Sequence, residues 1–155
     1  MTPPTRLILT GSQIEQIEKE GESAYPSECC GAILGRDLKD SEGIRRQVMR
    51  LEALKNSFQA DEQFHRFSLD PKELIDLEKR AGEAKLNVLG FYHSHPDHPA
   101  RPSEYDRSHA WPYYSYVIVE IAAGKAAEMT SWQLDPATEQ FISEEIAPEH
   151  ERTAP

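Results

Sequence analysis

Cysteine is scarce in this sequence: two of its 155 residues are Cys, and they are the neighbours Cys29 and Cys30. Adjacent side chains of an extended chain point in opposite directions, so a disulfide between them would be badly strained. A framework of disulfide bridges is therefore excluded, which fits a reducing compartment. Small apolar side chains are usually buried in strands, and we interpret both cysteines as core residues rather than reactive thiols.

Long apolar runs are also missing. No run approaches the roughly 18 residues that a helix needs to span a bilayer. The first six residues, Met-Thr-Pro-Pro-Thr-Arg, contain no apolar core of a secretory signal. The hydrophobic content of 38% and the mean hydropathy of -0.66 are ordinary for a globular protein. We therefore expect a cytoplasmic protein without a membrane partner.

Clusters of basic residues are the third absence. The chain has 17 Lys and Arg against 27 Asp and Glu, which gives a net charge of -10. Basic residues occur at most in pairs such as Arg45-Arg46, so the charge pattern of a nucleic-acid-binding protein is missing. An acidic surface favours solubility and can select a basic partner, and a halophilic habitat would explain it equally well.

Hydrophobic periodicity predicts one domain over residues 1–155, with a tail that frays after about residue 148. Strands are predicted at residues 6–10, 29–34, 44–54, 64–68, 86–95, 114–121, 125–134 and 141–142. A polar turn is predicted at residues 36–43. Helices and strands alternate at first, but a tight turn joins the strands near the end. The predicted fold is therefore α/β, with a mixed β-sheet flanked by helices in a sandwich, rather than a doubly wound parallel sheet.

Three helices are predicted, at residues 13–23, 71–85 and 104–110. Ser12 stands at the N-cap position of the first, Ser68 or Asp70 at that of the second, and Ser103 at that of the third. Pro71 suits the first turn of the second helix. The positions predicted to face inward are Ile14, Ile17, Leu74, Ile75 and Leu77.

The chemically informative residues gather between positions 90 and 106. The chain reads Gly-Phe-Tyr-His-Ser-His-Pro from Gly90, and then Pro-Ser-Glu-Tyr-Asp from Pro102. Side chains at i and i+2 of a strand share a face, so His93 and His95 project side by side. Asp106 supplies a third ligand if the proline-rich loop between them turns back. Two imidazoles and a carboxylate suit one tetrahedral zinc ion with an open fourth position.

A hydrolytic zinc site also needs a base that is not itself a ligand. Glu28 is the best candidate, because it enters an apolar strand directly after the loop at residues 25–27. A carboxylate in those surroundings is costly to bury without a role or a partner. Taken alone, however, Glu28 would be interpreted as a solvated residue at the end of a strand.

Together these residues resemble the motif of the JAMM (MPN-positive, Mov34-type) zinc metalloprotease family. That motif consists of a distant upstream Glu, then His-x-His-Pro, then a loop ending in Ser-x-x-Asp. Here the elements are Glu28, residues 93–96 and residues 103–106. Residues 27–35 and 116–119 are also similar to the family, and the resemblance covers about residues 7 to 134. It implies the MPN/JAB fold, a cytidine-deaminase-like sandwich.

The resemblance also implies the roles of the residues. His93, His95 and Asp106 would bind one zinc ion. Glu28 would act as general base on the metal-bound water and then as acid toward the leaving amine. Ser103 would donate a hydrogen bond to the tetrahedral oxyanion.

The family hydrolyses peptide or isopeptide bonds at the C-terminus of ubiquitin-like proteins. This chain is short and lacks ligands for a second zinc, so it is similar to the compact bacterial branch, which acts on small sulfur-carrier proteins ending in Gly-Gly and can release cysteine from them. Such a tail would bind extended along a sheet edge, and Asn56 in the segment 56–67 could contact its backbone. The sequence leaves open the carrier, the pathway (cysteine, thiamin, molybdopterin or siderophore sulfur supply) and whether the protein is a monomer or a homodimer.

Two alternatives compete with this interpretation. Residues 93–98 also match the HxHxDH signature of metallo-β-lactamase-type hydrolases, but those need a longer chain and more ligands, and only His109 and His150 remain downstream. In the JAMM interpretation Asp97 and His98 are left as possible outer-sphere groups. The second alternative is a non-catalytic adaptor of the same fold that only binds a ubiquitin-like partner. Such adaptors typically lack the metal ligands, which this chain retains.

Overall fold

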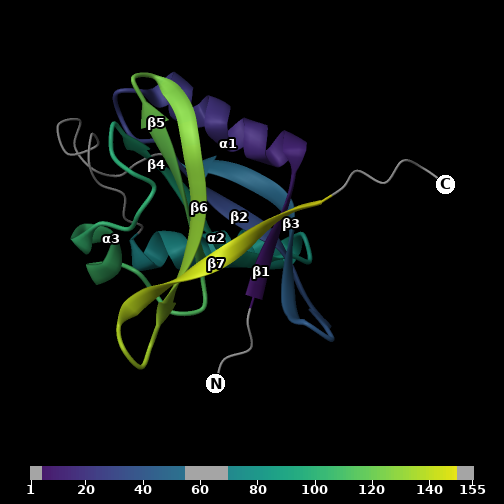
Figure 1. Cartoon of the computed structure of the whole chain (residues 1–155). Helices are drawn as coiled ribbons and strands as arrows, with labels where there is room; N and C mark the ends of the chain where they lie inside the picture. Colours follow the sequence, from purple (N-terminus) through teal and green to yellow (C-terminus); the bar gives the residue numbers. More distant parts are fainter. Residues whose placement is uncertain (1–4, 55–69, 150–155) are drawn as a thin grey trace.

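The computed structural model of the protein describes residues 5–54 and 70–149 (Figure 1). Asn56, the strand predicted at residues 64–68 and the tail beyond residue 149 lie outside these ranges. The elements in chain order are β1 (Thr5–Thr10), α1 (Gly11–Ala24), β2 (Cys30–Asp40), β3 (Gly43–Leu54), α2 (Pro71–Glu83), β4 (Asn87–Pro96), α3 (Glu104–Ser108), β5 (Ser115–Ala122), β6 (Lys125–Asp135) and β7 (Gln140–Glu149).

The strands form one mixed sheet that closes into a barrel in the order β1-β3-β2-β4-β5-β6-β7. β1 closes it, because it pairs in parallel with β3 on one side and with β7 on the other. The prediction of a mixed sheet with a few helices is confirmed, and the structure adds that this sheet closes into a barrel. The sequence did not indicate that the barrel closes, because β7 has few apolar residues in an alternating pattern. Only residues 141–142 indicated a strand there, and Ile142 is exposed.

Two apolar clusters lie on opposite faces of β4 and bury it almost completely. Tyr92 and Leu89 belong to the cluster that includes Ile17 of α1. Phe91 and Val88 belong to the cluster that includes Leu77 of α2. Figure 1 shows α1 along the upper edge of the barrel, where it packs against β4, β5 and β6. From residue 88 to residue 96 every side chain of β4 is buried, so the histidine strand is rigidly enclosed.

Several local predictions need correction. α1 is capped by Thr10 instead of Ser12, because Gln13 and Thr10 exchange hydrogen bonds between each side chain and the other's backbone N–H. The polar segment at residues 36–40 is the outer part of β2, paired with β3 in an exposed hairpin, and the turn is confined to residues 41 and 42. Ile75 is 67% exposed and does not face inward, whereas Leu77 is buried as predicted.

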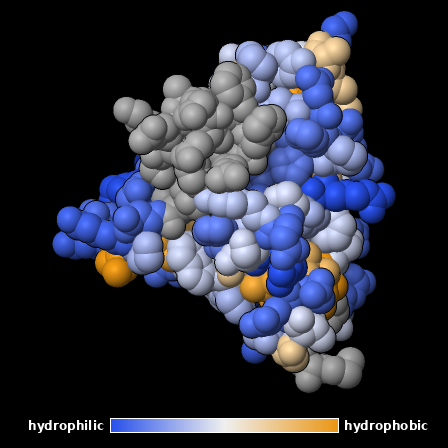
Figure 2. All heavy atoms as spheres, turned by 90° about the vertical axis from the view of Figure 1, so that its left-hand side faces the viewer, coloured by the Kyte–Doolittle hydropathy of each residue, from blue (hydrophilic) through white to orange (hydrophobic). Residues whose placement is uncertain are grey.

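No helix within residues 5–54 and 70–149 is long and apolar enough to cross a membrane. The face of the molecule that carries α3 is mostly hydrophilic, and its hydrophobic side chains form small separate patches (Figure 2).

A substitution at Gly90 tests how closely β4 packs against β5. A Cβ atom at this position would lie 1.8 Å from the backbone oxygen of Ser115, its register partner in β5. We expect Gly90→Ala to lower the free energy of unfolding by about 3 kcal/mol, the upper end for overpacking, because backbone must move. Urea denaturation followed by circular dichroism measures the change.

Gly82→Ala is the matched control, since nothing lies within 4 Å of a Cβ at this helical position. It should leave stability unchanged or raise it by up to about 1 kcal/mol. Equal effects of the two substitutions would contradict the proposed tight β4–β5 contact.

Candidate metal centre

Three ligand atoms converge at the end of β4. The Nε2 atoms of His93 and His95 lie 3.2 Å apart. Asp106 places Oδ1 3.3 Å from Nε2 of His93 and Oδ2 3.2 Å from Nε2 of His95. Ligands at 2.0–2.1 Å from a tetrahedral metal ion are separated by about 3.3 Å. These three side chains therefore fit the coordination sphere of one zinc ion and leave a fourth position open.

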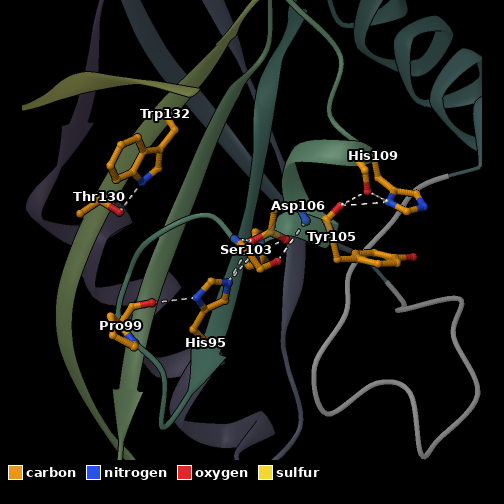
Figure 3. Close-up of polar contacts among 10 residues, drawn as sticks. His95, Pro99, Ser103, Tyr105, Asp106, His109, Thr130 and Trp132 are labelled. Atoms are coloured by element: carbon orange, nitrogen blue, oxygen red, sulfur yellow. Dashed lines mark hydrogen bonds and ion pairs between the residues drawn. The ribbon is translucent and has the colours of Figure 1, made fainter. Parts of the chain in front are cut away.

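A backbone contact sets the tautomer of His95. Its Nδ1 lies 2.8 Å from the carbonyl oxygen of Pro99, which can only accept a hydrogen bond (Figure 3). Nδ1 therefore carries the proton, and in the neutral ring Nε2 presents a lone pair to Asp106. Two lone pairs at 3.2 Å repel each other unless a cation lies between them. The donor set thus has the chemistry of a metal site as well as its dimensions.

Asp106 and Ser103 are fixed by the helix that contains them. Ser103 is the N-cap of α3, and its Oγ accepts a hydrogen bond from the Asp106 N–H at 3.0 Å. In return, Oδ2 of Asp106 accepts one from the Ser103 N–H at 2.8 Å. This reciprocal exchange aims the carboxylate back toward β4. Burial raises the pKa of Asp106, but the neighbouring His93 and the hydrogen bond from the Ser103 N–H outweigh it and hold that pKa well below its usual range.

The loop before α3 is anchored to β6. Ala100 is fully buried, and its carbonyl oxygen accepts a hydrogen bond from Thr130 Oγ1 at 2.6 Å. Trp132 Nε1 donates to the same Oγ1 at 2.8 Å (Figure 3). These contacts fix the backbone beside Pro99, the residue that orients His95.

Glu28 is held near the histidines by the strand pairing that begins directly after it. Cys30 is the register partner of His93. Ser94, between the two histidines, accepts a hydrogen bond from the Cys29 N–H at 2.8 Å and donates its own N–H to the Cys29 carbonyl at 3.2 Å. Glu28 is only 6% exposed. The backbone next to it is therefore tied to the strand that carries the two candidate ligands.

Glu28, His95 and Ser103 line one cleft of about 450 Å³, together with His98, Pro99 and Arg101. Burial and the nearby charge of Asp106 raise the pKa of Glu28 to about 9. Positive charge at the cluster would favour the ionised form of Glu28. The cleft thus contains a buried carboxylate, a hydroxyl and the edge of the three-donor cluster.

The remaining residues of the HxHxDH match, Asp97 and His98, lie in different places relative to the cluster. Asp97 turns away from the cluster at a positive φ of 57°, and its carboxylate accepts hydrogen bonds from Tyr25 Oη at 2.6 Å and from the Ala123 N–H at 2.8 Å. It does not approach the cluster as an outer-sphere group. His98 does lie in the cleft, with its ring edge-on to His95 at 6.5 Å between centroids. His109 is the C-cap of α3, where its ring stacks on Tyr105 at 3.9 Å between centroids, and it is not part of the cluster.

Neither cysteine has the properties of a nucleophile. Burial raises the pKa of Cys29 to about 11 and that of Cys30 to about 12. Thiols with such values are protonated at neutral pH and react slowly.

Three contributors to the site were not singled out in the sequence. The contact of the Pro99 carbonyl could not be predicted from the sequence, because every residue has a backbone carbonyl group. Ser94 stands between the two histidines. The two-residue repeat of a strand indicated only that its side chain faces the other side of the sheet from theirs. Arg101 lies in the loop, and its position in the cleft depends on how that loop folds back.

Asp106→Asn tests the metal centre without removing the cap of α3. The Asn side-chain oxygen can still accept from the Ser103 N–H, but the anionic ligand is lost. We expect zinc affinity to fall at least about 100-fold, since even changes behind the first ligand shell cost 10–100-fold. Elemental analysis after dialysis measures bound zinc, and a chelator should lower the melting temperature of the wild type but not of the variant.

Asp97→Asn is the control, because it changes a carboxylate of the same loop that bonds elsewhere. It should bind zinc like the wild type. Retention of zinc by Asp106→Asn at the affinity of the wild type would contradict this assignment.

The chain is similar to several known proteins. Residues 11–135 match the family of prokaryotic homologs of the JAB domain. The chain is 36% identical over 94 residues to a desampylase of Haloferax volcanii, a match that covers 60% of this chain and 62% of that protein. It is 26% identical over 106 residues to a desampylase of Pyrococcus furiosus, covering 67% and 68% of the two chains.

Two solved structures resemble the whole fold. A protein of Desulfitobacterium hafniense has a TM-score of 0.74 and 32% identity, with 95% of this chain and 94% of that chain covered. A protein of Salinibacter ruber has a TM-score of 0.66 and 35% identity, with 98% and 94% covered.

Proposed function

Because the chain belongs to the family of prokaryotic homologs of the JAB domain, we propose that it is a zinc-dependent metallopeptidase. Its substrate would be a peptide or isopeptide bond at the C-terminus of a ubiquitin-like or sulfur-carrier protein. The observation that carries the proposal is the cleft in which Glu28 and Ser103 face the edge of the three-donor cluster. The relatives named desampylase support a hydrolase that removes a ubiquitin-like protein from its conjugates.

His93, His95 and Asp106 would hold the zinc ion, which, when bound, would acidify a water molecule and polarise the scissile carbonyl. Glu28 would accept a proton from the attacking water and deliver it to the leaving amine. Its burial supports this role, because a carboxylate shielded from bulk water exchanges protons only inside the cleft. Ser103 Oγ already accepts the Asp106 N–H, so its own O–H is oriented away from that bond and would donate to the oxyanion.

A second cavity, a groove of about 760 Å³, is also lined by Glu28. It is lined by α1 from Ser12 to Ala24, by residues 28–30 and by Ala53 and Leu54 at the end of β3. β1 pairs with β3 only as far as Ile8 and Gln47, so within the described residues the strand from residue 48 onward has β2 as its only partner. The barrel thus leaves a local sheet edge that ends in this groove. An extended Gly-Gly tail could add to that edge and reach Glu28.

The partner that we propose is a small ubiquitin-like or sulfur-carrier protein ending in Gly-Gly. Both cysteines are free thiols, which suits the cytoplasmic location that we propose. A pure adaptor would not need a buried carboxylate beside three converged ligand atoms, so the intact cluster favours catalysis over binding alone.

Glu28→Gln tests the general base. The amide keeps the size of the side chain but cannot accept the proton, so we expect hydrolysis of a carrier-Gly-Gly-X substrate to fall about 10²- to 10⁴-fold. Zinc content and melting temperature should stay close to those of the wild type, because Glu28 is not one of the three converged ligands. Product release followed by mass spectrometry measures the rate.

Glu83→Gln provides the matched control, since Glu83 is an exposed carboxylate at the end of α2 and lines neither the cleft nor the groove. It should retain nearly full activity. Undiminished hydrolysis by Glu28→Gln, or a zinc-free wild-type protein that remains active, would contradict the proposed function.

Ser103 has both a capping and a proposed catalytic role, and a pair of substitutions separates them. Ser103→Ala removes the hydroxyl and should lower kcat about 100-fold, as for other oxyanion donors. Loss of the cap should cost about 1 kcal/mol of stability. Ser103→Thr keeps both the hydroxyl and the cap, and should retain far more activity. If the alanine variant loses stability but no activity, Ser103 is only a cap.

A further inference from the structure

Arg101 is the one arginine that lines the cleft containing Glu28, His95 and Ser103 among the described residues. Its backbone is fixed, because its N–H donates to the Pro99 carbonyl at 2.8 Å and the preceding Ala100 is buried and bonded to Thr130. The side chain itself is exposed. The exposed guanidinium side chain of Arg101 therefore extends from a fixed part of the loop, two residues before Ser103.

The charge of Arg101 is not neutralised by any carboxylate of the described residues. Four other arginines do form such ion pairs: Arg6 with Asp40, Arg46 with Asp37, Arg80 with Glu52, and Arg107 with Glu104. Among the described residues Arg36, Arg45 and Arg50 likewise form no such ion pair, but of these four arginines Arg101 is the one that lines the cleft. Its position in the cleft makes a substrate anion a natural partner.

The two cavities meet at Glu28, which lines both of them. If the Gly-Gly tail of the carrier lies in the groove beside α1, the leaving residue lies in the cleft with Arg101. A guanidinium group binds a carboxylate through two parallel hydrogen bonds. A lysine side chain, the leaving group of an isopeptide bond, gains nothing from a neighbouring cation.

We propose that Arg101 binds the free α-carboxylate of the leaving residue, so that the preferred substrate is a carrier extended by a C-terminal amino acid rather than a carrier joined to a lysine side chain. This inference rests on the proposed function. The amide C–N bond breaks, the water oxygen joins the carbonyl carbon, and Glu28 passes the proton to the amine. The products are a carrier ending in Gly-Gly and a free amino acid.

The test uses the zinc-loaded protein and two matched substrates. A ubiquitin-fold carrier ending in Gly-Gly is extended semisynthetically by alanine with a free carboxylate, or by alaninamide. We expect the wild type to favour the acid by about 10- to 100-fold in kcat/KM, the range of hydrogen bonds to charged groups. Arg101→Gln should bring this ratio close to one, and Arg101→Lys should retain part of it.

Arg45→Gln is the control for net charge, because Arg45 is exposed at the opposite end of β3. It should keep the wild-type ratio. Equal cleavage of acid and amide by the wild type, or an equal fall for both substrates in Arg101→Gln, overturns the role of Arg101 and leaves the proposed function intact. If the wild type cleaves neither substrate nor a Gly-Gly isopeptide conjugate, the proposed function itself fails.

Discussion

The close approach of two imidazole nitrogens and one carboxylate is the constraint on which the rest of this structure depends. The two Nε2 atoms lie 3.2 Å apart, and each lies 3.2–3.3 Å from one of the two carboxylate oxygens of Asp106, so lone pairs and negative charge face one another in a buried place. A surface loop could not hold such an arrangement. The histidines are held because β4 is paired on both sides, with β2 and with β5, and packed on both faces.

The same pairing places the proposed base. β2 enters the sheet opposite His93, and the hydrogen bonds of Ser94 to Cys29 hold the residue before the strand. Glu28 therefore reaches the cluster without belonging to it. Glu28 is buried where the chain enters β2, and the ionised carboxylate of Asp106 is nearby. Burial and this neighbouring charge together raise the pKa of Glu28.

Local sequence patterns predicted those parts of the site that depend on local geometry. His93 and His95 share a face because a strand repeats every two residues, and Ser103 and Asp106 form a capping exchange that any Ser-x-x-Asp at a helix start can adopt. Glu28 was selected from its place at the entry to an apolar strand, and the family resemblance supplied its role, but its approach to the histidines depends on the β2–β4 register, which the sequence did not indicate. The closure of the barrel by β7, the turn of Asp97 toward Tyr25 and the Pro99 carbonyl were missed because each depends on tertiary contacts with distant segments.

The charge distribution connects the overall composition with the chemistry proposed for the cleft. An acidic protein repels anions in general, so a bound carboxylate must be recognised locally. Arg101 and a metal ion at the cluster would both place positive charge in the cleft, whereas the groove contains Glu15 and Glu20 with one cation, Lys19, which pairs with Glu15. A field of this kind orients a substrate whose only anionic group is its terminal carboxylate. The Gly-Gly segment, which has no charged side chain, would then lie across Glu28. The polarity of the two cavities can therefore set the direction of the chain as well as its identity.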